Sequence, residues 1–189
     1  SSDLFVYYET LKNRYPNVRI LTWKKEFNYS AINNFAVREA RGEYLLFLNN
    51  DVEIITESWL EEMLQLCQQK DVGMAGAKLY YPDDTIQHAG VVVGLGGVAA
   101  HVLCKLPRDA EGYMGRLRCV QEISAVTAAC MMVKTSVFKA VGGFDEELKV
   151  AFNDIDLCMK VRKYGVKIVF TPYAELYHYE YGVNTIFTP

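Results

Sequence analysis

Three polar residues, Asn49, Asn50 and Asp51, follow directly after the apolar run 45–48. Such a run is typical of a strand with both faces buried, and ligands of open α/β sheets bind beyond the carboxyl ends of strands. A carboxylate flanked by amide oxygens suits a hard divalent cation, because Mg²⁺ is often held by one or two carboxylates together with water and substrate phosphate. Taken alone, the tripeptide is better explained by an Asx turn that leads into the next helix.

Asn153, Asp154 and Asp156 form a second polar cluster, at the start of a predicted helix. Helix capping by Asn153 or Asp154, with acids that complement the helix dipole, would explain the cluster structurally. A carboxylate at a helix N-terminus beside a ligand crevice is also well placed to act as a general base. Asp154 is the better candidate base, since Asp156 lies deeper in the first turn, where a dipole or capping role is sufficient.

His178 follows the last predicted strand and is flanked by Tyr177 and Tyr179. A packed, hydrogen-bonded histidine is the more common explanation for such a residue, and a metal ligand is the alternative. We interpret His88 and His101 as structural or loop residues.

Strand-like and helix-like segments alternate along the chain, which is the signature of an α/β domain. Ser58 and Glu61 fit a capping box at the start of a helix. Strands are predicted at 18–22, 43–48, 72–80, 91–95, 124–133 and 166–170, and helices at 30–40, from Ser58 onward, at 135–141 and at about 154–164. A turn is expected at 83–90, a long loop at 98–122 and an irregular aromatic tail at 175–189.

The composition narrows the class of protein further. The chain has 189 residues, 51% of them hydrophobic, and a net charge of −3, so it offers no broad electrostatic surface for nucleic acid or anionic lipid. The longest nearly apolar run, 91–103, is shorter than the roughly 20 residues that a membrane-spanning helix needs. Five cysteines without a C-x-x-C pair predict reduced thiols and a cytosolic location.

Six motifs in a fixed order resemble glycosyltransferase family 2, the inverting sugar transferases with the GT-A fold. More narrowly, the chain resembles the polysaccharide or rhamnosyl-type members. The resemblance implies a single GT-A-like α/β domain over residues 1–189, with a mixed, mostly parallel sheet flanked by helices. The motifs are NYSxxNNxA (28–36), ARGEYLLFLNND (40–51), GAKLYYPDDTIQHAG (76–90), VGGFDE (141–146), NDIDLC (153–158), and the last strand followed by His178.

The resemblance also implies roles for individual residues. The protein would transfer a sugar from a nucleotide diphospho-sugar to a hydroxyl of a glycan or lipid-linked glycan, with inversion, in surface polysaccharide synthesis. Asn153 stands where many members have glutamate. The implied assignments are Asn49, Asn50 and Asp51 for the donor (a DXD-type motif), Asp51 and His178 for Mn²⁺ or Mg²⁺, Asp154 as catalytic base, and Asp145, Glu146 and Asp156 on the acceptor side.

One departure from the family pattern leaves alternatives open. Family members open with a strand, a helix and an acidic residue that bind the nucleotide base and ribose, whereas Ser1-Ser2-Asp3 resembles the end of that segment. We therefore expect this first unit to be missing and the isolated fragment to be impaired in catalysis. The missing unit favours the alternative, a non-catalytic binding or scaffolding module. A metal-dependent phosphohydrolase or nucleotidyltransferase is disfavoured because the chain has no nucleophilic aspartate motif and no P-loop.

The resemblance also predicts a location and partners. It implies a cytoplasmic protein at the inner face of a membrane, associated peripherally through regions outside this chain. No nucleic-acid partner is expected.

Overall fold

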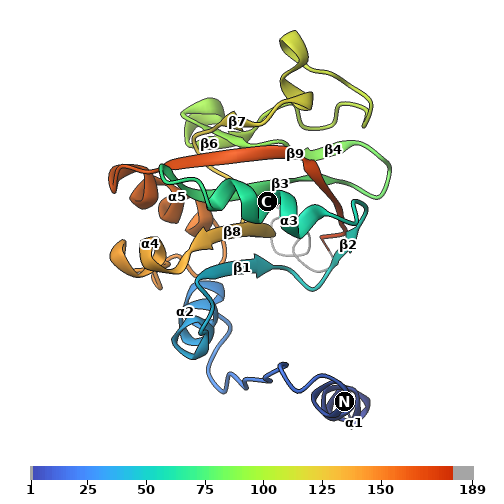
Figure 1. The fold of residues 1–189 in the computed structure, drawn as a ribbon, viewed down its shortest axis with the longest axis vertical. Helices are drawn as coiled ribbons and strands as arrows, with labels where there is room; N and C mark the ends of the chain where they lie inside the picture. Colours follow the sequence, from blue (N-terminus) through green and yellow to red (C-terminus); the bar gives the residue numbers. More distant parts are fainter. Residues whose placement is uncertain (1, 181–189) are drawn as a thin grey trace.

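The computed structural model describes residues 2–180 of the chain. Within them a main sheet of seven strands carries helices on both faces, which confirms the predicted α/β class (Figure 1). Helix α3 packs on one face, and α2, α4 and α5 pack on the other. All four helices coincide with predicted segments; they span Tyr29–Glu39 (α2), Trp59–Cys67 (α3), Thr135–Ala140 (α4) and Asn153–Lys163 (α5).

The main sheet has the strand order β1-β8-β3-β9-β2, with β4 beside β3 and β7 beside β9. It is mixed, as expected, but the expected majority of parallel pairings is corrected: among the described strands only β3 and β9 pair in parallel. A continuous apolar run indicates that both faces of a strand are buried, but it does not indicate whether the strand runs parallel or antiparallel to its neighbours. The strands are Tyr44–Leu48 (β1), Val52–Ile54 (β2), Val72–Tyr80 (β3), Ile86–His88 (β4), Gln121–Glu122 (β7), Cys130–Lys134 (β8) and Lys167–His178 (β9).

Several local predictions need correction. Residues 18–22 form no strand, β4 lies inside the predicted turn, and Ser58 makes no side-chain capping bond at the start of α3. The predicted loop 98–122 contains short elements, and β9 extends eight residues beyond 170 into the predicted irregular tail, of which 181–189 lie outside the described residues.

The remaining elements are α1 (Ser2–Arg14), which lies apart from the layers in Figure 1, the β5–β6 hairpin (Val91–Val93, Ala99–His101), and two 3₁₀ helices (Leu95–Gly97, Tyr113–Arg118).

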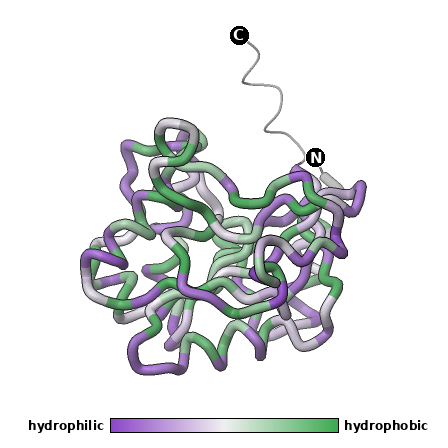
Figure 2. Tube along the Cα trace, turned by 90° about the horizontal axis from the view of Figure 1, so that it is seen from above, coloured by the Kyte–Doolittle hydropathy of each residue, from purple (hydrophilic) through white to green (hydrophobic). Residues whose placement is uncertain are grey.

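Apolar side chains on both faces of the sheet hold these layers together. All nine residues of β3 are buried, and in Figure 2 the hydrophobic segments run through the interior while hydrophilic ones lie mainly in outer loops. On the face of α5, Leu157, Cys158 and Val161 are fully buried against the sheet, as the helical spacing predicts. On the other face, Met63 and Cys67 of α3 are fully buried.

The sheet brings the ends of distant strands to one edge. Strands β1 and β3 are both antiparallel to β8, and β9 runs parallel to β3, so the carboxyl ends of β1, β3 and β9 point the same way. The long strand β9 shifts its register against β3 between Gly76 and Lys78 and bends toward β2 (Figure 1). Its last residue, His178, therefore lies opposite Val52, the first residue of β2.

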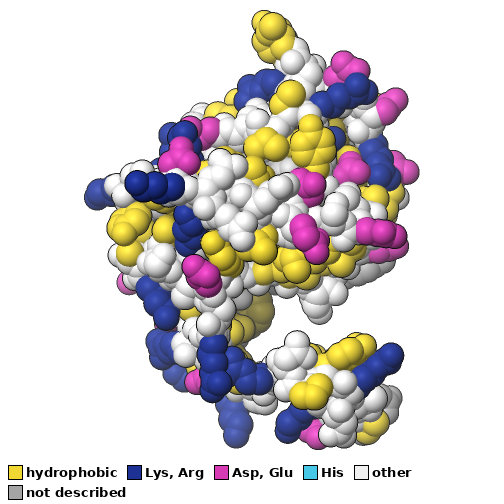
Figure 3. Space-filling view, in the orientation of Figure 1, with side chains coloured by type: hydrophobic (Ala, Val, Ile, Leu, Met, Phe, Trp, Pro, Cys, Tyr) yellow, Lys and Arg dark blue, Asp and Glu magenta, His cyan; other side chains and the backbone are white. Residues whose placement is uncertain are grey.

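The surface charge is unevenly distributed. Figure 3 shows Lys and Arg side chains around α2 and the segment before it, whereas acidic side chains gather on the side of β2 and β4. The net charge of −3 therefore conceals an uneven distribution of charge on this face. Among the described helices, none combines the length and the apolar character that a bilayer crossing requires.

Burial of α5 against the sheet should dominate the stability of this region. We expect Leu157→Ala to lower the free energy of unfolding by about 2–5 kcal/mol, because the leucine is fully buried and its removal leaves a cavity. Arg162→Ala, on the exposed face of the same helix, should change it by less than about 0.5 kcal/mol. Urea unfolding followed by circular dichroism measures both, and equal effects of the two substitutions would contradict this packing.

Candidate functional site

The segment Asn49–Asp51 is fixed by strand pairing at both of its ends. The Asn49 backbone N–H donates to the Ala129 carbonyl oxygen at 3.0 Å, which continues the pairing of β1 with β8. At the other end, the Tyr179 N–H donates to the Asp51 carbonyl oxygen at 2.9 Å, next to the pairing of β2 with β9. The next element after the tripeptide is a strand, so the turn into a helix that the tripeptide alone favours does not occur. Asn50 is exposed in this turn.

The imidazole of His178 lies against this segment. Its Nε2 atom is 3.2 Å from Asp51 Oδ1 and 3.2 Å from Asn49 Nδ2. The side chains of His178 and Asp51 are 11% and 15% exposed, so both are largely shielded from solvent. The structure thus brings together the residues assigned to metal and donor binding, while their roles remain predictions.

The chemistry of these two donors fits a divalent cation only in part. Adjacent ligand atoms in an octahedral shell with bonds of about 2.1 Å lie roughly 3 Å apart, close to the separation of His178 Nε2 and Asp51 Oδ1. The described residues contain no cluster of three or more His, Cys, Asp or Glu side chains arranged to hold a metal. The pair therefore suits Mn²⁺ or Mg²⁺ if water and a substrate diphosphate supply the other ligands.

Asp154 lies in the first turn of α5, with its carboxylate held by backbone N–H groups. Its Oδ1 accepts from the Ile155 N–H at 2.8 Å, and its Oδ2 accepts from the Ala128 N–H at 3.3 Å. Phe152, the residue immediately before α5, has a φ of 62°, a conformation that is unusual for a residue with a side chain. The helix N-terminus adds a favourable electrostatic environment for the negative charge. The carboxylate is thus oriented and partly exposed, so it could accept a proton from a bound group.

A hollow of about 200 Å³ joins these parts of the site, and we call it the crevice. Asn49, Asp154 and His178 all line it. Tyr29 lines it as well, and burial, with a smaller contribution from the Asp154 carboxylate, raises the pKa of its phenol above the ordinary value. Tyr29 therefore stays protonated, and its hydroxyl donates to the Ala128 carbonyl oxygen at 3.3 Å. Sequence reasoning did not single out Tyr29, although it belongs to the NYS motif.

The three residues assigned to the acceptor side do not line the crevice. The Glu146 carboxylate accepts from Asn34 Nδ2 at 3.1 Å and borders a separate hollow of about 470 Å³. The Asp145 carboxylate accepts from a neighbouring backbone N–H, and Asp156 forms an ion pair of 2.6 Å with Lys160 one turn along α5. An acceptor role for any of them remains a prediction.

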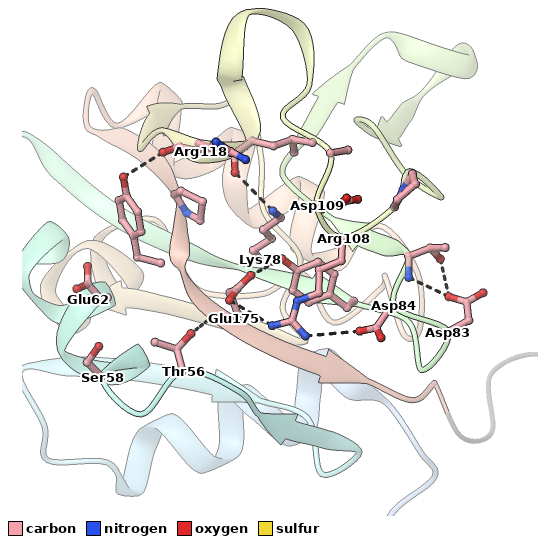
Figure 4. Close-up of a pocket in the computed structure, with 17 residues that line it drawn as sticks. Thr56, Ser58, Glu62, Lys78, Asp83, Asp84, Arg108, Asp109, Arg118 and Glu175 are labelled. Atoms are coloured by element: carbon pink, nitrogen blue, oxygen red, sulfur yellow. Dashed lines mark hydrogen bonds and ion pairs between the residues drawn. The ribbon is translucent and has the colours of Figure 1, made fainter.

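A larger cavity, of about 1120 Å³, lies elsewhere in the described part of the chain, between β3, β9 and the 98–122 segment (Figure 4). Arg108 reaches across it from that segment, forms ion pairs of 3.5 Å with Asp84 and Glu175, and lies 4.9 Å from the centre of the Tyr80 ring. Five residues of the motif at 76–90 line this cavity, but none of the residues to which we assigned a catalytic, donor, acceptor or metal role does. We therefore take the smaller crevice as the candidate site, because a carboxylate, an imidazole and a helix N-terminus converge there.

Comparisons with known proteins agree with this fold. A family model described as "Glycosyltransferase like family" matches residues 15–182. The chain is 52% identical over 180 residues to the uncharacterized protein y4gI of Sinorhizobium fredii and 42% identical over 166 residues to the O-antigen biosynthesis protein RfbC of Myxococcus xanthus. These matches cover 95% and 87% of this chain but only 20% and 13% of the two relatives. The chain belongs to the glycosyltransferase-like family.

Solved structures share the fold at low sequence identity. GalNAc-T7 with UDP, GalNAc and Mn²⁺ matches with a TM-score of 0.71 and 12% identity, over 92% of this chain and 34% of that one. The mannosyltransferase PcManGT of Pyrobaculum calidifontis with GDP-Man and Mn²⁺ matches with a TM-score of 0.66 and 14% identity, over 95% and 46%. Together with the family match, they confirm the resemblance to glycosyltransferase family 2 and its GT-A fold.

The Arg108 contacts should hold the 98–122 segment on the sheet. We expect Arg108→Met to lower the free energy of unfolding by only about 1 kcal/mol, because the guanidinium is partly exposed, but to speed proteolysis within 98–122. Arg41→Met, at an exposed position before β1, serves as the control and should leave the cleavage rate unchanged. Limited trypsin digestion read by mass spectrometry measures cleavage after Lys105, Arg116 and Arg118, which both variants retain, and identical cleavage there would contradict the anchoring role.

Proposed function

We propose that this domain transfers a sugar from a nucleotide diphospho-sugar to a hydroxyl of a glycan or lipid-linked glycan, with inversion of the anomeric configuration. The proposal rests on three residues that are far apart in the chain: Asp154 and His178 line one crevice, and Asp51 lies 3.2 Å from the His178 imidazole. We assign the Asp51 carboxylate to the donor diphosphate, and the Asp154 carboxylate, which lines the hollow, to accepting a proton. These are the two tasks that glycosyl transfer by direct displacement requires.

Asp154 acts as the general base in this mechanism. As the acceptor hydroxyl attacks the anomeric carbon, its proton moves to the Asp154 carboxylate, and the nucleotide diphosphate leaves from the opposite face of the sugar. The N–H groups of Ile155 and Ala128 fix the carboxylate in position, so little reorientation is needed when the hydroxyl arrives.

Asp51 and His178 would hold Mn²⁺ or Mg²⁺ at the donor diphosphate, and Asn49 and Asn50 lie beside them. The cation supplies Lewis-acid stabilisation of the charge that develops on the leaving phosphate. Asp51 is placed to contribute the negative charge and His178 the neutral nitrogen ligand.

The relatives support the substrate class and the setting. RfbC is a protein of O-antigen biosynthesis, and the structural neighbours were solved with UDP or GDP-Man and with Mn²⁺. The five cysteines of the chain are all free thiols, as a reducing compartment favours. We accordingly propose a cytoplasmic domain that works at the inner face of a membrane in surface polysaccharide synthesis, associated with it through regions outside this chain.

The assignment of the base can be tested in the full-length protein. We expect Asp154→Asn to lower the transfer rate by roughly 10²–10⁴-fold, because the amide cannot accept the proton, while donor affinity stays near wild type. Asp71→Asn, at an exposed position before β3, is the matched acid-to-amide control and should retain the rate. Assays use a panel of nucleotide diphospho-sugars, and wild-type turnover by Asp154→Asn would exclude this residue as the base.

A second test concerns Asp51. Asp51→Ala should weaken donor binding by at least about tenfold when Mn²⁺ is present and have little effect when Mn²⁺ is removed, because the carboxylate acts through the cation. Calorimetric titration of the full-length protein with nucleotide diphospho-sugars, with Mn²⁺ or with EDTA, measures both conditions.

The same titration addresses the alternative. The alternative is a non-catalytic binding module, and Asn153, an amide where many family members have an acid, is compatible with it. If this alternative holds, the wild type should bind no donor under either condition.

A further inference from the structure

Gln87 is a buried polar residue that the mechanism above does not use. It belongs to the QHAG end of the third motif, lies in β4 and is 4% exposed. Strand β4 pairs with the end of β3, next to β9, and this pairing directs Gln87 at His178. Its side chain makes two hydrogen bonds to this one residue.

The two bonds fix the orientation of the Gln87 amide. Its Nε2 donates to the His178 backbone carbonyl oxygen at 3.2 Å, and its Oε1 lies 2.8 Å from His178 Nδ1. A flipped amide would place Oε1 against that carbonyl oxygen, so that two acceptors would face each other in a buried site. The amide oxygen is therefore the atom that meets the imidazole.

This orientation determines which ring nitrogen of His178 carries the proton. An amide oxygen can only accept a hydrogen bond, so Nδ1 must be the protonated nitrogen. In the neutral imidazole the lone pair then lies on Nε2, the atom that is 3.2 Å from Asp51 Oδ1 and from Asn49 Nδ2. Only an unprotonated ring nitrogen can bind a cation.

We propose that Gln87 is a positioning residue that holds His178 in the Nδ1–H tautomer and thereby presents the Nε2 lone pair to the divalent cation shared with Asp51. The proposal rests on the proposed function for the identity of the cation. That Nδ1 carries a proton follows from the Gln87 hydrogen bonds alone, and the tautomer can be tested without activity. Metal-bound histidines commonly depend on such an outer hydrogen bond for their tautomer and ring orientation.

Three substitutions separate positioning from mere packing. Gln87→Met keeps the approximate volume and removes both polar groups, while Gln87→Glu restores an acceptor for Nδ1–H. Thr171→Val is the matched control, since Thr171 is a fully buried polar residue of the same strand as His178 but lies seven residues before it. Thermal unfolding of each variant verifies that the protein remains folded.

The first measurement is ¹⁵N NMR of the histidine side chains at about pH 8, where an unperturbed imidazole is neutral. The chain has three histidines, so one His→Gln variant for each assigns every ring signal. We expect His178 in the wild type, Gln87→Glu and Thr171→Val to show Nδ1–H and an unprotonated Nε2. In Gln87→Met the Nε2–H tautomer should appear. A wild type with Nε2–H, or an unchanged spectrum in Gln87→Met, would overturn the proposal.

The second measurement is Mn²⁺ affinity in the presence of pyrophosphate, followed by electron paramagnetic resonance of free Mn²⁺. Gln87→Met should bind Mn²⁺ roughly 10–100-fold more weakly, as is typical when an outer-shell partner is lost. Gln87→Glu should recover most of the affinity, and Thr171→Val should match the wild type. Equal affinity of Gln87→Met and wild type would overturn the role of Gln87 toward the metal. Absence of Mn²⁺ binding by the wild type would instead overturn the metal-dependent function, and the NMR result would still decide the tautomer.

Discussion

The candidate site depends on one antiparallel contact, the pairing of the end of β9 with the start of β2. Val52 lies opposite His178, and the Tyr179 N–H bonds to the Asp51 carbonyl oxygen. This contact adds β2 to the sheet next to β9 and brings Asp51 against the His178 imidazole. Without it, the tripeptide after β1 would be an ordinary exposed turn, because neither Asn49 nor Asp51 would have the histidine as a neighbour.

The neighbouring elements each constrain this contact from a different direction. Strand β3 guides β9 to the edge through the parallel pairing, and β4 adds the Gln87 side chain on the far side of the imidazole. Helix α5, packed on the sheet through Leu157, brings Asp154 to the same crevice. The Arg108 contacts lie around a separate cavity and hold the 98–122 segment, so anchoring of that segment and assembly of the site use different residues.

Local sequence signals were sufficient for the parts of the site that lie at the ends of regular elements. The apolar run before Asn49 and the amphipathic pattern after Asp154 place each residue correctly, because strand burial and helix periodicity are short-range properties. The partners of His178 could not be predicted in this way. They depend on the bend of β9 and on the register with β2, and nothing in 175–180 distinguishes a strand from an irregular tail. Residues 18–22 show the opposite error, since a β-like composition forms no strand without a partner to pair with.

The left-handed conformation of Phe152, immediately before α5, has a consequence for how this protein tolerates change. A non-glycine residue in that region carries a conformational penalty of about 1–3 kcal/mol, and the packing of the rest of the domain must compensate for it. Selection for heat resistance would tend to remove such a penalty, for instance by glycine at this position. The same replacement would loosen the backbone next to Asn153 and Asp154 at the start of α5. A gain in thermal stability at this position would therefore come with a less rigidly held Asp154 carboxylate.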